Sequence, residues 1–236
     1  MAQPGGVLSR AGHTEAASDM ALLVGLEPAG VLVEVLNPDG TMARRPELEA
    51  CAREHGLKVG SIEALSRHRL ETEHTIECID SREIETDHGP FQLHTYRDRL
   101  SHGVHFALQR GEADAASPAL VRVQMQNVLA DALHWRRDDF GPLAGDAQAA
   151  IAEAGQGVLL MLSEPAPGTE ALLARIRNEA ASPTPSASEW RRNGAGSQIL
   201  ADLGYGQLKV LGTPRKQVGL AGFGLEVVEY VALPPR

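Results

Sequence analysis

The sequence has little cysteine, few aromatic residues and no long apolar run. Cys51 and Cys78 are its only cysteines, and they have neither the spacing of a metal site nor the number needed for a disulfide framework. No apolar stretch approaches the length of a membrane span, and residues 1–20 lack the apolar centre of a signal peptide. These features predict a protein of a reducing compartment, and we expect it in the cytoplasm.

Basic charge is also scarce. The chain carries 22 Lys and Arg against 31 Asp and Glu, which gives a formal net charge of −9. This balance argues against general binding to nucleic acid or to an anionic membrane surface, although it permits a local basic pocket for a small phosphorylated ligand. With 236 residues and 43% hydrophobic content, the chain can form one large or two modest domains.

Helix and strand patterns alternate at the start of the chain. The apolar spacing over residues 14–24 predicts a helix, with Thr14 as its N-cap and Gly25 as its stop. The β-branched residues of 30–36 predict a strand, which ends at the turn signal Asn-Pro-Asp-Gly. This order favours an α/β or α+β fold.

A second helix is expected to begin at Pro46 and to end at Gly56. The polar run 66–75 is typical of an inter-domain linker. We therefore expect a first domain over 1–68, a linker over 69–75 and a second domain over 76–236.

The second part of the chain has the pattern of a mixed α+β domain. Alternating segments separated by turn signals predict strands, and one continuous apolar run predicts a buried strand. The expected strands are 91–96, 105–110, 119–125, 157–162, 208–212 and 225–233. The expected helices are 144–154, 169–180 and 196–203, with a flexible loop at 181–189 and a helix end and turn at 219–224.

Polar residues gather just before the first expected helix. A helix N-terminus offers unpaired N–H groups and a partial positive charge, which suit a phosphate. Arg10 adds a bidentate donor, and Gly12 lets a ligand approach the backbone closely. His13 can ligate a metal or move a proton, and Thr14 adds a hydroxyl. The alternative is that Thr14 only caps the helix while Arg10 and His13 are solvated.

Glu34 lies within the expected strand 30–36. Alternation places it between Leu32 and Leu36 on one face of the strand, opposite the valines. A carboxylate at this position either faces solvent at a sheet edge or has a function that compensates for its burial, and the pattern leaves both open.

Residues 4–65 resemble the C-terminal part of 3,4-dihydroxy-2-butanone 4-phosphate synthase, a lyase that converts ribulose 5-phosphate to a four-carbon phosphate and formate with divalent magnesium. The resemblance rests on Arg-Ala-Gly-His-Thr-Glu-Ala at 10–16, on the strand glutamate and on Asn-Pro-Asp-Gly-Thr-Met-Ala-Arg at 37–44, in this order and spacing. It implies that the sugar-phosphate site is lined by Arg10, Ala11, Gly12, His13 and Thr14.

The same resemblance implies roles for two side chains. His13 would be a ligand of Mg²⁺ or Mn²⁺, and Glu34 would contact the substrate and assist proton transfer. Enolisation of a ketose phosphate needs a metal to polarise the carbonyl and a base to remove a carbon-bound proton. The family's acidic loop, which supplies another metal ligand and catalytic acids, has no counterpart in these residues. We therefore expect that the chain is part of a longer gene product or that its lyase half has lost activity.

From about residue 76 the chain resembles GTP cyclohydrolase II. That family opens the guanine ring with a water activated by zinc, which three cysteines hold. The positions that match these cysteines are Asn127, Asp138 and Phe140, so we expect neither zinc nor zinc-dependent hydrolysis. The resemblance rests on the segments 89–111, 118–124, 151–162, 196–204 and 214–233.

The positions that correspond to nucleotide contacts are only partly kept. The phosphate loop expected after residue 162 lacks an arginine. The positions that match catalytic or nucleotide-contacting residues of the family are Arg122, Glu189, Arg191 and Lys216. The alternative interpretation of these four is ordinary surface charge.

Together, the two resemblances predict a riboflavin-biosynthesis protein of the lyase family with a zinc-less GTP cyclohydrolase II-like domain. The expected substrate is ribulose 5-phosphate, GTP is a second candidate ligand, and both families imply a homodimer. Two alternatives stay open, an active GTP cyclohydrolase and a non-catalytic module that binds a nucleotide or a sugar phosphate.

Overall fold

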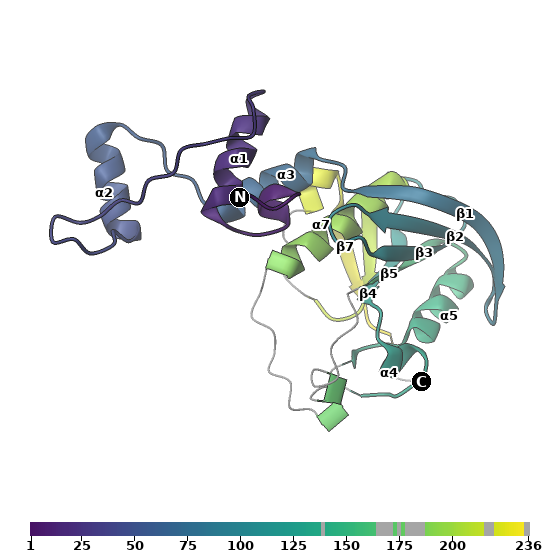
Figure 1. Cartoon of the computed structure of the whole chain (residues 1–236). Helices are drawn as coiled ribbons and strands as arrows, with labels where there is room; N and C mark the ends of the chain where they lie inside the picture. Colours follow the sequence, from purple (N-terminus) through teal and green to yellow (C-terminus); the bar gives the residue numbers. More distant parts are fainter. Residues whose placement is uncertain (138–139, 164–171, 174–175, 178–186, 215–219, 234–236) are drawn as a thin grey trace. The chain divides into compact units, whose positions relative to one another are not determined.

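The computed structural model divides into two compact units, Met1–Thr72 and Glu73–Arg236 (Figure 1). Within the part of the chain that the structure describes, no helix is long and apolar enough to cross a membrane. The structure describes residues 1–137, 140–163, 172–173, 176–177, 187–214 and 220–233.

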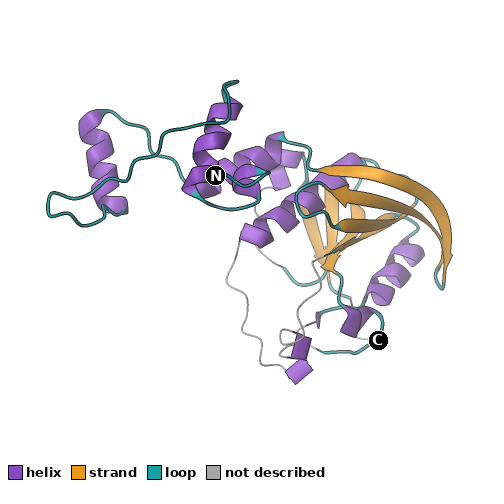
Figure 2. Ribbon diagram, in the orientation of Figure 1, coloured by secondary structure: helices purple, strands orange, loops and turns teal. Residues whose placement is uncertain are grey.

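The first unit is helical, and its elements begin and end where the local sequence favours it. Proline occupies the first turn of the second helix, and Gly56 ends that helix in the left-handed conformation, with φ of 64°. Both features confirm the prediction for this helix. The elements of the unit are η1 (Gly6–Leu8), α1 (His13–Leu23), α2 (Arg45–His55) and α3 (Ile62–Thr72) (Figure 2).

A buried ion pair joins three of these elements. Arg69 of α3 donates through Nη1 to Asp19 Oδ2 of α1 at 2.8 Å and to the carbonyl of Gly5 at 2.9 Å. The same carboxylate accepts the N–H of Val7 in η1 at 2.7 Å. A Cβ on Gly6 would lie 1.9 Å from Asp19 Oδ1, so only glycine fits there. The pair therefore fixes η1, α1 and α3 together.

Residues 30–36 do not form the predicted strand. Their one ladder contact is an isolated antiparallel bridge between Leu36 and Met42, which spans the predicted turn. Val31 and Val33 are 95% and 86% exposed, and no strand of the described residues pairs with 30–35. A strand needs a neighbour to accept its backbone hydrogen bonds. The sequence of 30–36 has strand propensity, but no other described segment supplies a neighbouring strand for it.

Two further expectations for the first unit are corrected. Helix α1 begins at His13 with Gly12 as its N-cap, and no side chain caps it, so Thr14 is not the cap. The polar run 66–75 is helical as far as Thr72, because Arg69 and Leu70 supply a buried side of α3, but the boundary between the two units, after Thr72, lies inside this run. The stop at Gly25 is confirmed by its left-handed φ of 79° just beyond the helix.

The second unit contains a seven-stranded mixed sheet in the order β1-β2-β3-β5-β4-β6-β7. The pairs β1·β2, β2·β3 and β3·β5 are antiparallel. The pairs β5·β4, β4·β6 and β6·β7 are parallel. The central strand β5 is the most deeply buried, as its continuous apolar sequence predicts. The strands are β1 (Ile76–Thr86), β2 (Gly89–Asp98), β3 (Val104–Arg110), β4 (Ala119–Met125), β5 (Gly157–Leu162), β6 (Gln207–Leu211) and β7 (Glu226–Val231).

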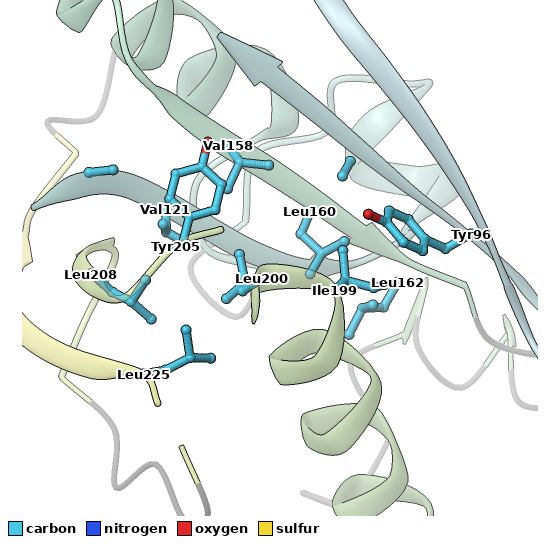
Figure 3. Packing of buried hydrophobic residues seen from close by; sticks show 12 residues of the cluster. Tyr96, Val121, Val158, Leu160, Leu162, Ile199, Leu200, Tyr205, Leu208 and Leu225 are labelled. Atoms are coloured by element: carbon cyan, nitrogen blue, oxygen red, sulfur yellow. The ribbon is translucent and has the colours of Figure 1, made fainter. Parts of the chain in front are cut away.

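Helices cover both faces of this sheet. On one face Ile199 and Leu200 of α7 (Ala187–Asp202) pack against the strands, in a cluster that includes Tyr96 and Leu160 (Figure 3). On the other face α5 (Ala144–Ala154) packs through Ile151 and its neighbours. The remaining described elements are α4 (Val128–Asp131) and η3 (Leu220–Phe223). The unit thus has two cores, as a mixed α/β fold requires.

Most of the elements predicted for the second unit are confirmed. The six predicted strands and the helix at 144–154 are present, and the predicted turn at 219–224 contains η3. Strand β1 was not predicted, since its polar sequence gives a weak alternation at the sheet edge. The helix predicted near 196–203 begins earlier, at Ala187. The helix predicted at 169–180 lies mostly outside the described residues, as do positions 181–186 of the predicted loop.

Candidate functional site

Arg10 and Glu15 form an ion pair at the first turn of α1. The Arg10 Nε and Nη2 atoms lie 2.9 and 2.6 Å from Glu15 Oε1. The N–H of Gln3 donates to the same oxygen at 2.9 Å. The Glu15 side chain is fully buried, whereas that of Arg10 is 54% exposed. The buried carboxylate therefore holds the guanidinium at the surface, beside the helix N-terminus.

Gly12 fits this arrangement because it has no side chain. A Cβ at this position would lie 2.5 Å from Glu15 Oε2, and that carboxylate cannot retreat without losing Arg10 and Gln3. The backbone of Gly12 is extended, with φ of −125°, and its N–H donates to the Arg10 carbonyl at 2.8 Å. The glycine is required by the close approach of the carboxylate rather than by a left-handed backbone.

The arrangement has the electrostatics of a small oxyanion site. The hydrogen bonds from Arg10 and from the Gln3 backbone lower the pKa of Glu15 to about 2, so the carboxylate stays ionised and keeps the guanidinium in place. The N-cap residue Gly12 has no side chain to cap α1, and within the first turn the N–H of Glu15 bonds its own carboxylate, which leaves the N–H groups of His13 and Thr14 for a ligand. An arginine beside a helix N-terminus is a favourable combination for a phosphate group.

The other residues predicted for this site have different surroundings. Ala11 and His13 are exposed, and Thr14 is half-buried one residue into the helix. Glu34 is also exposed, in the segment that forms no strand. No hydrogen bond or ion pair within the described residues joins Glu34 to His13 or to Arg10, so the structure does not bring the two predicted catalytic side chains into contact.

A complete divalent metal site is not assembled by the described residues. No group of three or more His, Cys, Asp or Glu side chains converges there. Mg²⁺ prefers six ligands in octahedral array, most of them oxygens, and a lone exposed imidazole supplies one nitrogen. These residues do not by themselves fit the metal that the lyase resemblance implies, and His13 remains only a predicted ligand.

In the second unit, two of the positions that match zinc-binding cysteines have structural contacts. The Asn127 side chain caps α4 by accepting the N–H of Leu129 at 3.2 Å. The Phe140 ring packs edge-to-face against Trp135, with ring centroids 5.9 Å apart, and the Arg137 guanidinium lies 4.3 Å from the Phe140 centroid. A helix cap and a cation–π cluster thus occupy positions where the family would place thiolates. Asp138 lies outside the described residues.

Of the four predicted nucleotide contacts, only Arg122 has a side chain that the structure describes. Arg122 is half-buried on β4, and its Nη1 donates to the carbonyl of Leu211 at 3.0 Å. Glu189 and Arg191 belong to α7, but their side chains lie outside the description, and Lys216 is outside it altogether. The Arg122 guanidinium therefore has a backbone partner that ties β4 to the end of β6.

Glu15 is the residue of the first site that sequence reasoning missed. The prediction assigned roles to the five residues before it and none to the glutamate, although it belongs to the same motif. A signal was available, because an acidic residue in the first turn that lies five positions after an arginine and three after a glycine can fold back onto both. Its burial could not be predicted, since it depends on contacts with Gln3 at a distance of twelve residues.

Comparisons with known proteins agree with this division. A family model of 3,4-dihydroxy-2-butanone 4-phosphate synthase matches residues 1–68, and one of GTP cyclohydrolase II matches residues 77–232. The curated 3,4-dihydroxy-2-butanone 4-phosphate synthase of Pseudomonas aeruginosa is 47% identical over 234 residues, which are 98% of this chain and 64% of that protein. Riboflavin biosynthesis protein RibBA of Aquifex aeolicus is 41% identical over 244 residues, covering 98% of this chain and 60% of that protein.

A solved structure is similar along the whole chain. The crystal structure of a two-domain 3,4-dihydroxy-2-butanone 4-phosphate synthase from A. baumannii matches with a TM-score of 0.73 and 38% identity, and it covers 100% of this chain and 63% of that one. The fold and the matches define a two-part α/β protein with a lyase-related first unit and a cyclohydrolase-related second unit. The chain belongs to the riboflavin-biosynthesis family that joins a 3,4-dihydroxy-2-butanone 4-phosphate synthase region to a GTP cyclohydrolase II-like region. It spans a little under two thirds of the length of these relatives.

Proposed function

We propose that this chain supplies the phosphate-binding part of a 3,4-dihydroxy-2-butanone 4-phosphate synthase site, which acts on ribulose 5-phosphate in riboflavin biosynthesis. The observation that carries the proposal is the Arg10 guanidinium, held by buried Glu15 beside the uncapped N-terminus of α1. An arginine and a helix start can bind a phosphate away from the reacting carbons and orient the sugar. The match of residues 1–68 to the lyase family supports the same substrate.

The catalytic part of the reaction needs more than the described residues offer. For Glu34 to transfer a proton, its side chain must approach the bound sugar. Pairing of residues 30–36 with a neighbouring strand would favour that approach. Ligands for Mg²⁺ or Mn²⁺ besides His13 would have to come from residues outside those described. We therefore propose that turnover needs catalytic and metal-binding groups besides those that the described residues provide.

For the second unit we propose a structural or binding role without zinc-dependent opening of the guanine ring. The helix cap at Asn127 and the packed ring of Phe140 support this proposal, because neither side chain is a suitable zinc ligand. We also propose a cytoplasmic homodimer, on the basis of the family resemblance. Light scattering after gel filtration measures its mass, and a monomer at micromolar concentration would contradict it.

Ribulose 5-phosphate binding tests the main proposal. Isothermal titration of the 236-residue chain is expected to give a saturable isotherm with ribulose 5-phosphate, and Arg10→Ala is expected to weaken it at least about tenfold, because a charged hydrogen-bond donor to phosphate is lost. Arg45→Ala is the matched control, since Arg45 pairs with Glu49 on the exposed surface of α2. The proposal is wrong if the wild type shows no binding. GTP, titrated in parallel, tests the second candidate ligand.

A further inference from the structure

We infer that Glu15 is the positioning residue for the phosphate-binding arginine, and this inference rests on the proposed function. Glu15 touches no substrate atom in this role. It acts through Arg10, by fixing which edge of the guanidinium faces the ligand.

The geometry of the pair determines that edge. Glu15 Oε1 accepts a hydrogen bond from Arg10 Nε at 2.9 Å and lies 2.6 Å from Nη2, and it therefore occupies one side of the planar guanidinium. A guanidinium has five N–H donors, so the edge formed by Nη1 and the second Nη2 hydrogen stays open for bidentate contact with an oxyanion. The 54% exposure of the Arg10 side chain agrees with an accessible outer edge.

Burial explains why Glu15 can hold the arginine in this way. Its carboxylate is anchored by the N–H of Gln3 and is packed against Gly12, where no Cβ could be accommodated. Glu15 Oε2 has no hydrogen-bond partner within the described residues and is buried beside that glycine. The Glu15 carboxylate is thus held by the Gln3 N–H and by its packing against Gly12. An exposed carboxylate would instead move together with the arginine.

The benefit to binding is lower conformational entropy loss. A free arginine side chain loses much of its rotamer freedom when a ligand immobilises it. An arginine already fixed by a buried carboxylate has lost that freedom during folding, so less is lost on binding. The pair is electrically neutral, which means that the site selects an oxyanion by donor geometry and by the helix N-terminus more than by net charge.

A double-mutant cycle tests this role in the 236-residue chain. We expect Glu15→Gln, which preserves shape but removes the charge, to weaken binding of ribulose 5-phosphate about tenfold, because a charge-assisted contact is lost. In an Arg10→Ala background the same change is expected to have no further effect, since its target is gone. Glu49→Gln, which breaks the exposed pair with Arg45, is the matched control and is expected to leave binding unchanged.

A readout without ligand separates this inference from the proposed function. The Arg10 Nε–H resonance of the wild type is expected to exchange slowly with water and to exchange faster in Glu15→Gln, as measured by NMR. If the exchange rate is unchanged, or if Glu15→Gln weakens binding equally with and without Arg10, the positioning role is wrong while the proposed function stands. If the wild type binds neither ribulose 5-phosphate nor inorganic phosphate, the proposed function is wrong and the positioning role for it is wrong as well, whatever the exchange rate.

Discussion

The Arg69 guanidinium and the Asp19 carboxylate meet inside the first unit, with 2.8 Å between Nη1 and Oδ2 and less than a tenth of either side chain exposed. A buried ion pair of this kind is weak evidence for stability by itself, because both charges have lost their hydration. Removing one partner is different, since it leaves the other charge buried and unpaired. The pair therefore determines how the first unit responds to mutation.

We expect Arg69→Met to destabilise the first unit by about 3–5 kcal/mol, the usual cost of breaking a buried pair from one side. Amide hydrogen exchange of α1 measures the effect, because Trp135 and Trp190 both lie in the second unit and do not report on the first. Arg45→Met is the control, as the Arg45 side chain is 89% exposed. Unchanged protection of α1 in Arg69→Met would contradict the prediction.

Gly12→Ala is expected to destabilise the first turn of α1 by about 1–3 kcal/mol, as in other overpacked sites. The new Cβ would lie 2.5 Å from Glu15 Oε2 and would force the carboxylate away from Arg10. We therefore expect weaker binding of ribulose 5-phosphate together with faster hydrogen exchange at the start of α1. Gly60→Ala is the control, because a Cβ there meets nothing within 4 Å. Equal results for the two variants would refute the close-approach argument.

Acid is expected to destabilise the second unit partly through Asp98. Burial raises the pKa of Asp98, but the His105 imidazole, the Ser101 hydroxyl and two backbone N–H groups outweigh it and lower the pKa to about 2. The stabilisation is complete above the ordinary pKa of 3.8 and is lost as the pH falls from about 4 towards 2, with about 2 kcal/mol at stake for this buried group.

Urea unfolding followed by tryptophan fluorescence measures this dependence at pH 6 and pH 3. Asp98→Asn is expected to lower stability at pH 6 and to reduce the difference between the two pH values by about 1 kcal/mol, because the folded-state carboxylate, with a pKa of about 2, is still largely ionised at pH 3. Glu85→Gln, on the exposed part of β1, is expected to leave the difference unchanged. The same pH dependence in Asp98→Asn and in the wild type would rule out the assignment.

Asn127→Ala is expected to destabilise the second unit by about 1 kcal/mol, because it removes the side-chain cap of α4. Asn127→Asp keeps an acceptor at the cap and should restore most of that loss, as measured by urea unfolding with tryptophan fluorescence. If position 127 were a metal ligand, Asn127→Asp would be more stable than the wild type, but only when zinc is added. That result would contradict the capping role.

Zinc itself is expected not to stabilise the second unit. A metal that binds only the folded state raises the unfolding free energy according to its concentration and affinity. With Phe140 packed against Trp135 we expect the urea midpoint of the wild type to be the same in excess zinc and in chelator. A zinc-dependent rise in the midpoint would overturn the prediction.

Local sequence signals specified most of the regular elements. Helix α2 could be predicted because proline and glycine act on their own backbone, and β5 could be predicted because continuous burial requires a continuous apolar run. The failures depend on distant contacts. The strand pattern of 30–36 has no neighbour to pair with, and the polar surface of α3 concealed the buried Arg69, whose partner lies fifty residues earlier in the chain.

The part of the candidate site that depends on neighbouring residues in the chain could be predicted, and the part that depends on distant contacts could not. Arg10, Gly12 and the helix start are adjacent in the chain, so their proximity needed only a correct helix boundary. The role of Glu15 depends on burial, which needs the packing of the N-terminal residues against α1. Glu34 was placed by its expected strand, and its exposure follows from the absence of a pairing neighbour among the described residues.

The exposed aliphatic side chains of Val31 and Val33 have a consequence for how the chain associates with other copies. An extended apolar segment that pairs with no strand presents unpaired N–H and C=O groups on which another chain can pair. These exposed valines therefore make residues 30–36 the expected starting point for aggregation of the 236-residue chain.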